Sequence, residues 1–218
     1  MFLTPFRRRS VGKLMLIRRS LPFFLLIFLT ASSAWHSATA QTLKNLDGSV
    51  NIFGQFSGTS NGNGVKDSPT DSLGVIASVR QSFHLWLGYE VNYGYTRFSE
   101  RYSTIPFGVQ NNLHEVSGAY LVQAPTIPLL GLQPFASVGL GALVFLPTTV
   151  GGQKYSEQYR LALLYELGVN YPILTSHLGL RLQYRGLSYK TPDFNASLIT
   201  TNARRQTSEP SVGAYFRF

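Results

Sequence analysis

The chain has 218 residues, of which 19 are Lys or Arg and 10 are Asp or Glu, giving a formal net charge of +9, and it contains no cysteine. The lack of cysteine excludes disulfide bonds, thiolate metal sites and cysteine nucleophiles. Six of the basic residues and none of the acidic ones lie before residue 20, so the rest of the chain carries a net charge of only +3. The high overall charge is therefore poor evidence for nucleic-acid binding, and we expect no nucleic-acid partner.

The amino-terminal segment, residues 1–40, has the features of a cleavable secretory signal. Its basic start is followed by an apolar run at residues 21–29, which is too short to span a bilayer as a helix. Ala38 and Ala40 then form a small-x-small cleavage site. An uncleaved membrane anchor is the alternative, and Pro22 argues against it. Because the basic start is unusually long, translation begins at either the first or the second methionine of the chain, Met1 or Met15.

After residue 40 the chain shows runs with a period of two, which is the pattern of β-strands. In the clearest run Tyr89 and Tyr93 fall on one face, while Glu90 and Asn92 fall on the other. Segments rich in turn-forming residues separate these runs. We expect residues 41–218 to form one domain of eight strands. The predicted strands are residues 48–58, 73–82, 85–98, 112–124, 132–146, 158–171, 177–189 and 206–218.

The predicted connections alternate between long and short. Outer-membrane barrels have short periplasmic turns and longer external loops, so this alternation places both ends of the domain on the periplasmic side. An even number of strands closes the sheet and leaves no unpaired edge in lipid. The predicted fold class is all-β, a closed antiparallel up-and-down transmembrane barrel of eight strands. The long connections are residues 59–72, 99–111, 147–157 and 190–205, and the short ones are 82–84, 125–131 and 172–176.

A soluble barrel with its apolar face inward is the alternative. It would place tyrosines such as Tyr93 and Tyr165 in an interior that is only wide enough to be filled by side chains. On the apolar faces of the later strands almost no charge occurs, Arg97 being the exception. Tyrosines near strand ends are typical of the lipid–water interface. We therefore predict that the apolar faces contact lipid.

The opposite faces of the strands carry four arginines and three glutamates. Charges at membrane depth are tolerated where they face the interior and pair with one another, and the guanidinium group suits bidentate pairing with carboxylates. We expect these residues to form a polar network that plugs a narrow lumen; a gated ion path and a catalytic acid/base pair are the alternatives. The predicted network consists of Glu90, Glu115, Arg160, Glu166, Arg181, Arg185 and Arg217.

The end of the chain resembles the assembly signal of Gram-negative outer-membrane barrels. That signal has a polar residue, a glycine two places on, and two aromatic or apolar residues at alternate positions, which here are Ser211, Gly213, Phe216 and Phe218. With the alternation and the loop lengths, this ending resembles the small eight-stranded outer-membrane barrels, such as the OmpA transmembrane domain and OmpX-like proteins. The resemblance implies a place in the outer membrane, insertion by the barrel-assembly machinery with periplasmic chaperones, and contact with outer-membrane lipid and lipopolysaccharide.

We expect a monomer with a structural or surface-interaction role and with no catalytic residue, cofactor or metal site. Two other functions stay open: an enzyme that acts on lipid A or phospholipid, and a small pore. A hydrolase would need a serine–histidine pair and an orienting acid. The histidines of the predicted domain, His84, His114 and His177, are not part of the His-x-Ser motif that the lipid A deacylases carry.

Two loop features are weaker candidates. The segment at residues 61–64, with Asp67 and Asp71, contains calcium-ligand residue types, but its spacing matches no defined calcium loop. Arg204 and Arg205 are candidates for contact with lipopolysaccharide phosphates at the outer rim. A solvated loop is the ordinary explanation of both features.

Overall fold

The computed structural model describes residues 45–148, 155–173 and 177–218, so the predicted signal peptide lies outside the described residues, as do parts of the connections predicted at 147–157 and 172–176. The described residues belong to one unit, Asn45–Phe218. No helix among them is long and apolar enough to cross a bilayer. The elements are β1 (Leu46–Ser57), β2 (Ser60–Gly62), β3 (Val65–Pro69), β4 (Ser72–Ser82), β5 (Leu87–Tyr102), β6 (Gly108–Gln123), β7 (Gln133–Pro147), β8 (Gln158–Pro172), β9 (Leu178–Lys190), the 3-10 helix η1 (Ser197–Ile199) and β10 (Arg204–Arg217).

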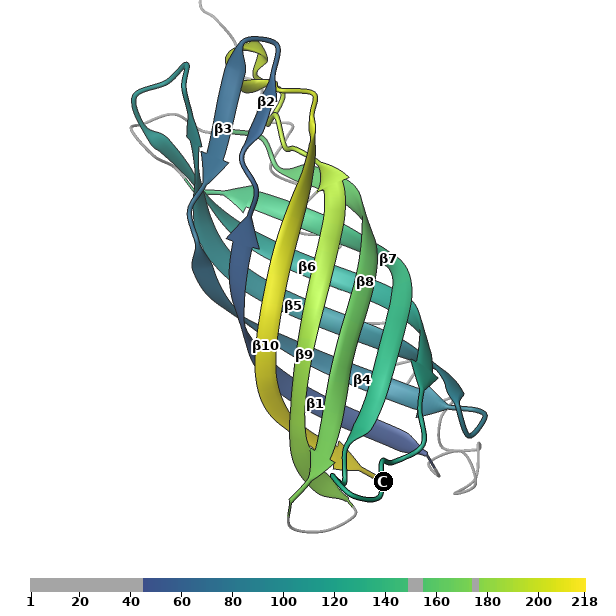
Figure 1. Ribbon diagram of the computed structural model, residues 1–218. Helices are drawn as coiled ribbons and strands as arrows, with labels where there is room; N and C mark the ends of the chain where they lie inside the picture. The colour runs from purple at the N-terminus through teal and green to yellow at the C-terminus, as the bar shows by residue number, and fades with distance from the viewer. Residues whose placement is uncertain (1–44, 149–154, 174–176) are drawn as a thin grey trace, which may run out of the picture. The chain divides into compact units, whose positions relative to one another are not determined.

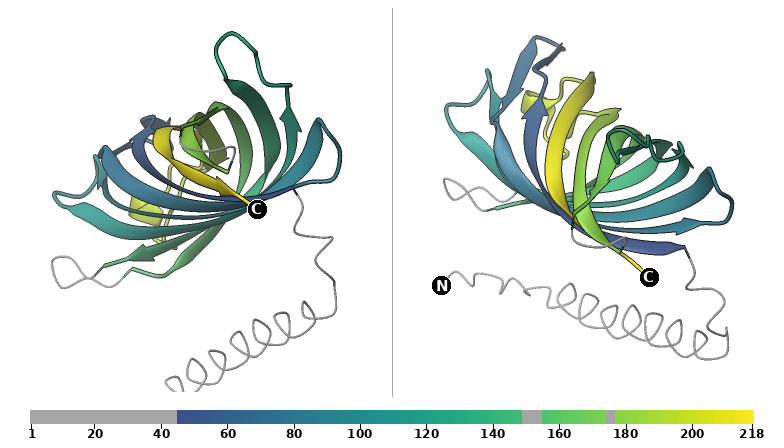
Figure 2. Two further views of the ribbon diagram at one scale, coloured as in Figure 1. Left: turned by 90° about the horizontal axis from the view of Figure 1, so that it is seen from below. Right: turned by 60° about the horizontal axis from the view of Figure 1, so that its bottom comes forward.

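Eight long strands close into an antiparallel barrel, which confirms the predicted fold class (Figure 1). From β4 to β10 each strand pairs with the next along the chain, and β1 closes the ring by pairing with both β4 and β10. Figure 2 shows these strands arranged around a common axis. At one end, the terminal end, the Phe218 N–H donates to the Leu46 carbonyl at 2.9 Å. The opposite end carries β2 and β3, and we call it the hairpin end.

The two faces of the barrel wall differ as predicted. Tyr93 and Leu163 are 49% and 48% exposed, whereas Glu90 and Arg181 are 1% and 0% exposed. Because successive side chains of a strand point to opposite faces, the strands present apolar groups outward and place their charged groups in the lumen. The prediction that the apolar faces point outward is therefore confirmed. Other exposed apolar residues on this outer face are Val50, Ile52, Leu73, Val75, Tyr120, Val138, Leu140, Leu161, Leu167, Leu180, Leu182, Val212 and Phe216.

The segment at residues 59–72, predicted as a loop, contains the hairpin of β2 and β3. Asn63 and Gly64 have φ values of 50° and 73°, which is the positive-φ pair that a two-residue hairpin turn needs. β3 then pairs with the end of β5, where Asp67 is opposite Tyr102. The hairpin therefore extends the sheet beyond the barrel at the hairpin end.

The predicted alternation of connection lengths is wrong at two places. β5 and β6 continue through most of the predicted loop at 99–111, so that only residues 103–107 connect them. The connection between β6 and β7, at residues 124–132, is longer and contains a bridge between Ile127 and Leu132. The additional strand length forms because Tyr102 and Val109 face inward and are buried, which favours continued pairing over an exposed loop.

The lumen is not polar throughout, because a cluster of buried apolar residues fills one part of it. At the hairpin end, large inward residues such as Leu143 and Phe145 pack against Phe194 and Ile199 of the connection between β9 and β10. We call this set the mouth cluster, because it fills the hairpin end of the lumen. Its members are Val65, Phe98, Tyr102, Val109, Leu113, Ala119, Leu143, Phe145, Ala162, Leu164, Leu187, Tyr189, Phe194 and Ile199.

Candidate functional site in the barrel lumen

Arg185 is the centre of the charge network in the lumen. Its guanidinium group lies 2.6 Å from Glu115 Oε1, 2.6 Å from Glu209 Oε2 and 3.6 Å from Glu166 Oε2. The four side chains come from four different strands and are all buried. A buried charge is tolerated only when it is paired and hydrogen-bonded, so Arg185 and its three glutamates depend on one another.

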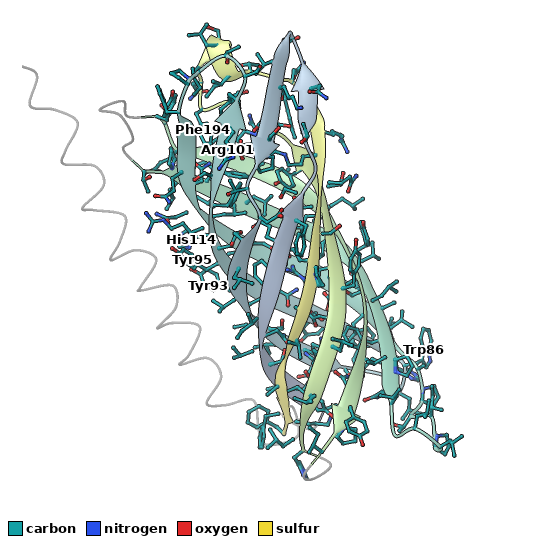
Figure 3. All side chains as sticks on the ribbon, turned by 60° about the vertical axis from the view of Figure 1, so that its left-hand side comes forward. Trp86, Tyr93, Tyr95, Arg101, His114 and Phe194 are labelled. Carbon is teal, nitrogen blue, oxygen red and sulfur yellow. The ribbon has the colours of Figure 1, made fainter. Side chains whose placement is uncertain are left out.

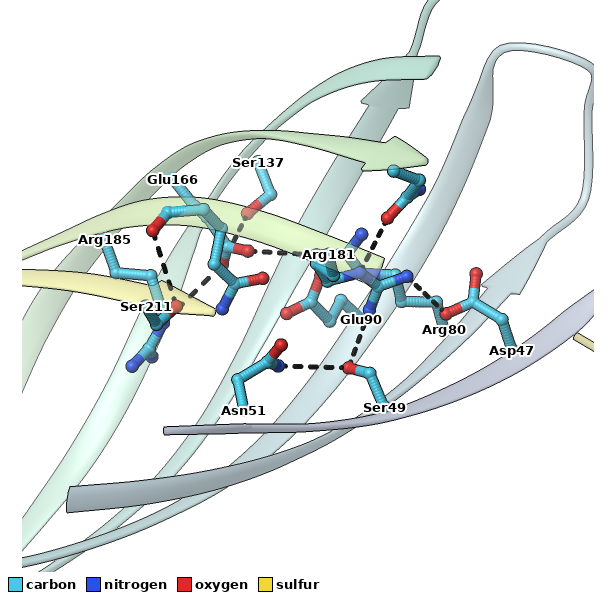
Figure 4. A network of polar contacts seen from close by, with 12 residues as sticks. Asp47, Ser49, Asn51, Arg80, Glu90, Ser137, Glu166, Arg181, Arg185 and Ser211 are labelled. Carbon is cyan, nitrogen blue, oxygen red and sulfur yellow. Dashed lines mark hydrogen bonds and ion pairs between the residues drawn. The ribbon is translucent and has the colours of Figure 1, made fainter. Parts of the chain in front are cut away.

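Arg80 extends the network across the barrel. Its Nε donates to Glu90, and its Nη2 donates to Glu166 Oε1 at 2.9 Å. Its guanidinium group also lies 3.9 Å from the centre of the Phe135 ring, a cation–π distance. Because Glu166 contacts both Arg80 and Arg185, two arginines on opposite parts of the wall share one carboxylate (Figure 4).

Arg181 holds a second layer of the network nearer the terminal end. Its Nη2 donates to Asp47 Oδ1 at 2.7 Å, its Nη1 to Ser49 Oγ at 2.7 Å, and its Nε to Asn170 Oδ1 at 2.8 Å. Each guanidinium nitrogen thus has an acceptor. These partners lie on β1 and β8, so Arg181 connects β9 with strands on both of its sides (Figure 4).

Arg205 forms a third layer, at the hairpin end. Its Nη1 donates to Glu100 Oε1 at 3.0 Å and its Nη2 donates to Asp67. The Tyr102 hydroxyl donates to the other Glu100 oxygen at 2.6 Å. Arg205 is buried, so the expectation that it reaches lipopolysaccharide phosphates is wrong; only its neighbour Arg204 points outward.

The two aspartates of the candidate calcium segment do not share one environment. Asp67 faces the lumen beneath the hairpin, whereas Asp71 is exposed. Among the described residues, no three His, Cys, Asp or Glu side chains are placed so that they could hold a metal ion. Asp67 instead attaches the β2–β3 hairpin to the barrel through Arg205.

The Asp67 carboxyl group titrates in an unusual range. Burial and the charge of the neighbouring Glu100 raise the pKa of Asp67 to about 9, and the charge of Arg205 offsets only part of this rise. An aspartate in the unfolded chain has a pKa of about 3.9. At pH values between these two pKa values, Asp67 is protonated when the hairpin is docked and ionised when it is free. Docking therefore weakens as the pH rises from about 4 to about 9.

We expect amide hydrogen exchange of β3 to be faster at pH 8 than at pH 5, after correction for the intrinsic pH dependence of exchange. The opening equilibrium changes by at most about tenfold per pH unit for one proton. Asp67→Asn should remove most of this difference, because the amide keeps the shape and carries no charge. Asp71→Asn, at an exposed position, is the control and should behave as the wild type. Equal protection of β3 at both pH values in the wild type would contradict a proton held on Asp67 in the docked hairpin.

Two predicted network residues lie outside the buried layers. Arg160 pairs with Asp193 at 3.0 Å, where both side chains are about one-fifth exposed. Arg217 donates to Gln133 Oε1 at 2.9 Å near the terminal end and is only partly buried. Burial raises the pKa of Asp193, but hydrogen bonds from Gln158 and the Asn195 N–H and the charge of Arg160 bring it below its ordinary value.

The structure brings five predicted residues together and adds others that the sequence analysis had not selected. Among the described residues, four buried arginines face seven buried carboxylates, which reverses the expected excess of arginine. The period-2 pattern already places Arg80 on the same inner face as Ser78, so it could have been predicted as a network residue. Asp67 could not, because it lies in a segment that was predicted as a loop. The buried charged residues are Asp47, Asp67, Arg80, Glu90, Glu100, Glu115, Glu166, Arg181, Arg185, Arg205 and Glu209.

The histidines and the carboxy-terminal pattern lie on the barrel wall and its ends. His114 faces outward, and its Nδ1 lies 2.8 Å from the Tyr93 hydroxyl (Figure 3). Its neighbour Glu115 points into the lumen, so the two do not form an acid–histidine pair. Phe216 and Phe218 are exposed at the terminal end with their ring centres 5.0 Å apart. Their role in assembly stays a prediction, as does that of Ser211 and Gly213.

A closed ring of strands, apolar outside and filled with charges inside, defines a transmembrane β-barrel. Residues 23–218 match the family model described as outer membrane protein beta-barrel domain. The chain belongs to this family, and the protein is located in the outer membrane.

Several solved structures have a similar fold. Neisserial surface protein A is 16% identical, with a TM-score of 0.58, over 80% of this chain and 98% of that chain. OprG from Pseudomonas aeruginosa is 13% identical, with a TM-score of 0.56, over 83% and 99% of the two chains. AlkL is 15% identical, with a TM-score of 0.52, over 83% and 93%. At these identities the likeness shows the fold alone, and a comparison with curated proteins gave no match.

Proposed function

We propose that the protein is a monomeric, non-enzymatic barrel with a closed lumen, which has a structural role and presents its hairpin end for contact with other surfaces. The filled lumen is the observation that carries this proposal. Arg181, Arg80 and Arg185 cross the interior with their carboxylates, and the mouth cluster fills the hairpin end. An eight-stranded barrel has an interior only wide enough for such side chains, so the network acts as a plug.

The orientation follows from the ends of the barrel. The first and last strands meet at the terminal end, where the Phe218 N–H bonds to Leu46. The hairpin of β2 and β3 and the long connection between β9 and β10 lie at the other end (Figure 1). Barrels of this kind carry their longer loops outside the cell. The hairpin end is therefore external in this proposal, where it meets lipopolysaccharide and other surfaces, and the barrel-assembly machinery inserts the chain from the periplasm.

The surroundings of two histidines favour a non-enzymatic role. A serine hydrolase needs an imidazole that bonds to a serine and is oriented by an acid. The His114 ring nitrogen contacts the Tyr93 hydroxyl, and His84 Nδ1 accepts from the Leu85 N–H. Both imidazoles thus have partners other than serine, on the outer surface of the barrel or its connections.

We expect the refolded protein to give no steady conductance steps in a planar lipid bilayer. The reason is that buried ion pairs and the mouth cluster occupy the path along the barrel axis. An open porin measured in the same bilayers is the control for detection. Reproducible single-channel steps from the wild-type protein would contradict the plug and support the small pore instead.

A further inference from the structure

The outer face of the barrel carries a pair of cations at the hairpin end. Lys190 is the last residue of β9 and Arg204 the first of β10, and the two are register partners. Both are exposed, and they lie on the outer face because their neighbours Tyr189 and Arg205 point into the lumen. Neither makes an ion pair within 4 Å among the described residues.

A groove descends from these cations along the apolar wall. It has a volume of about 240 Å³. Leu140 and Leu163, which are register partners on β7 and β8, form its side together with Leu161. Leu163 in turn pairs with Ser188 of β9, whose small side chain leaves room in the wall. The groove is therefore apolar towards the middle of the barrel and basic at its external end.

We propose that this groove binds one phosphorylated lipid of the external leaflet, the lipid A part of lipopolysaccharide. Lys190 and Arg204 would hold a phosphate, since both residue types bind phosphate by charge-assisted hydrogen bonds. An acyl chain of the same lipid would lie on Leu140, Leu161 and Leu163. The inference rests on the orientation proposed above, which places the hairpin end in the external leaflet.

The charges around the groove favour an anionic occupant. The charge of Lys190 contributes to lowering the pKa of Asp193, but the Asp193 carboxylate forms its ion pair with Arg160 and not with Lys190. Arg97 on β5 also has no carboxylate partner among the described residues, but its Nη2 donates to Gln110 Oε1 at 2.6 Å and it does not line the groove. Lys190 and Arg204 thus combine two cations without an ion-pair partner and an adjoining apolar groove.

Native mass spectrometry of the folded protein in detergent with lipid A tests the proposal. The double variant Lys190→Gln with Arg204→Gln should bind lipid A about tenfold or more weakly than the wild type, because hydrogen bonds to two charged groups are lost. The matched control is Arg97→Gln with Arg101→Gln. Both arginines are exposed on β5 and neither lines the groove, so this variant loses the same charge and should bind as the wild type. Lipid A without its phosphates should bind the wild type and the first variant equally weakly. An equal loss in both double variants, or no loss in the first, would overturn the site.

A separate labelling experiment distinguishes failure of the site from failure of the orientation. The chain has no cysteine, and Leu198 of η1 is 68% exposed, so Leu198→Cys introduces a single accessible thiol. A membrane-impermeant maleimide should label this thiol on intact cells. Labelling without any effect of the Lys190 and Arg204 changes on lipid A binding overturns the site alone. Absence of labelling on folded protein overturns the orientation, and with it the choice of lipid A.

Discussion

Replacement of Arg185 by methionine is expected to destabilise the barrel by about 3–5 kcal/mol. The change leaves Glu115, Glu209 and Glu166 buried without the cation that they share. Methionine keeps much of the length of the side chain, so the loss of charge and hydrogen bonds dominates over the loss of volume. Urea unfolding in detergent micelles, followed by far-UV circular dichroism and by the heat-modifiable shift on a gel, measures the effect.

Arg160→Met provides the control for this prediction. Arg160 also pairs with a carboxylate, but it and Asp193 are about one-fifth exposed, so water solvates the charge that remains. Partly exposed ion pairs contribute about 1 kcal/mol or less. If the Arg185 and Arg160 variants lost similar stability, the buried network would not be the structural centre of the barrel.

Gly213→Ala is expected to reduce the folded fraction strongly, by preventing the last strand from closing on the first. A Cβ atom at this position would lie 2.1 Å from the Val50 carbonyl oxygen and 2.5 Å from the Asn51 Cα. Both contacts are with backbone atoms, which cannot rotate away as a side chain could. The cost is at least the roughly 1–3 kcal/mol typical of overpacking. The fraction that migrates as the compact form on an unheated gel measures the effect.

Gly48→Ala is the matched control within the same strand pair. Gly48 lies opposite Phe216 in the pairing of β1 with β10, and the nearest atom to its added Cβ is the Ser78 carbonyl oxygen at 4.0 Å. This variant should fold as the wild type. Normal folding of Gly213→Ala, or equal damage from Gly48→Ala, would show that close approach at Gly213 does not limit closure of the barrel.

The alternation of the sequence predicts the fold because each strand separates lipid from lumen. Leu163 is an apolar residue that faces outward, and Glu166, three residues later, is a charged residue that faces the lumen. The same alternation placed Glu90, Arg181 and Arg185 in the lumen. Parity along a strand is thus a direct physical consequence of the two environments.

The period-2 pattern could not predict which charged residues pair with each other, or where the strands end. Arg205 and Asp67 are far apart in sequence and meet only because the β2–β3 hairpin pairs with the end of β5. Arg160 shares the parity of Glu166, but it lies near the end of its strand and pairs with Asp193 of a connection instead. Such contacts depend on three-dimensional register, which a pattern within one strand does not contain.

The mouth cluster escaped prediction for a related reason. Near the hairpin end of β7, inward and outward residues are both apolar, as Leu143 and Phe145 alternate with Val144 and Leu146. A run that is apolar on both faces has no period of two, so it does not indicate which side is packed. The connection that supplies Phe194 and Ile199 also carries no strand pattern of its own.

Nuclear Overhauser effects between leucine methyl groups and detergent or lipid acyl chains test the assignment of faces most directly. Leu163 and Leu164 are adjacent residues of the same type, yet Leu163 is 48% exposed on the outer face and Leu164 is fully buried in the mouth cluster. In the folded protein we predict strong contacts from acyl chains to the Leu163 methyl groups and none to those of Leu164. Acyl-chain contacts to Leu164 with none to Leu163 would show that the barrel wall faces the other way.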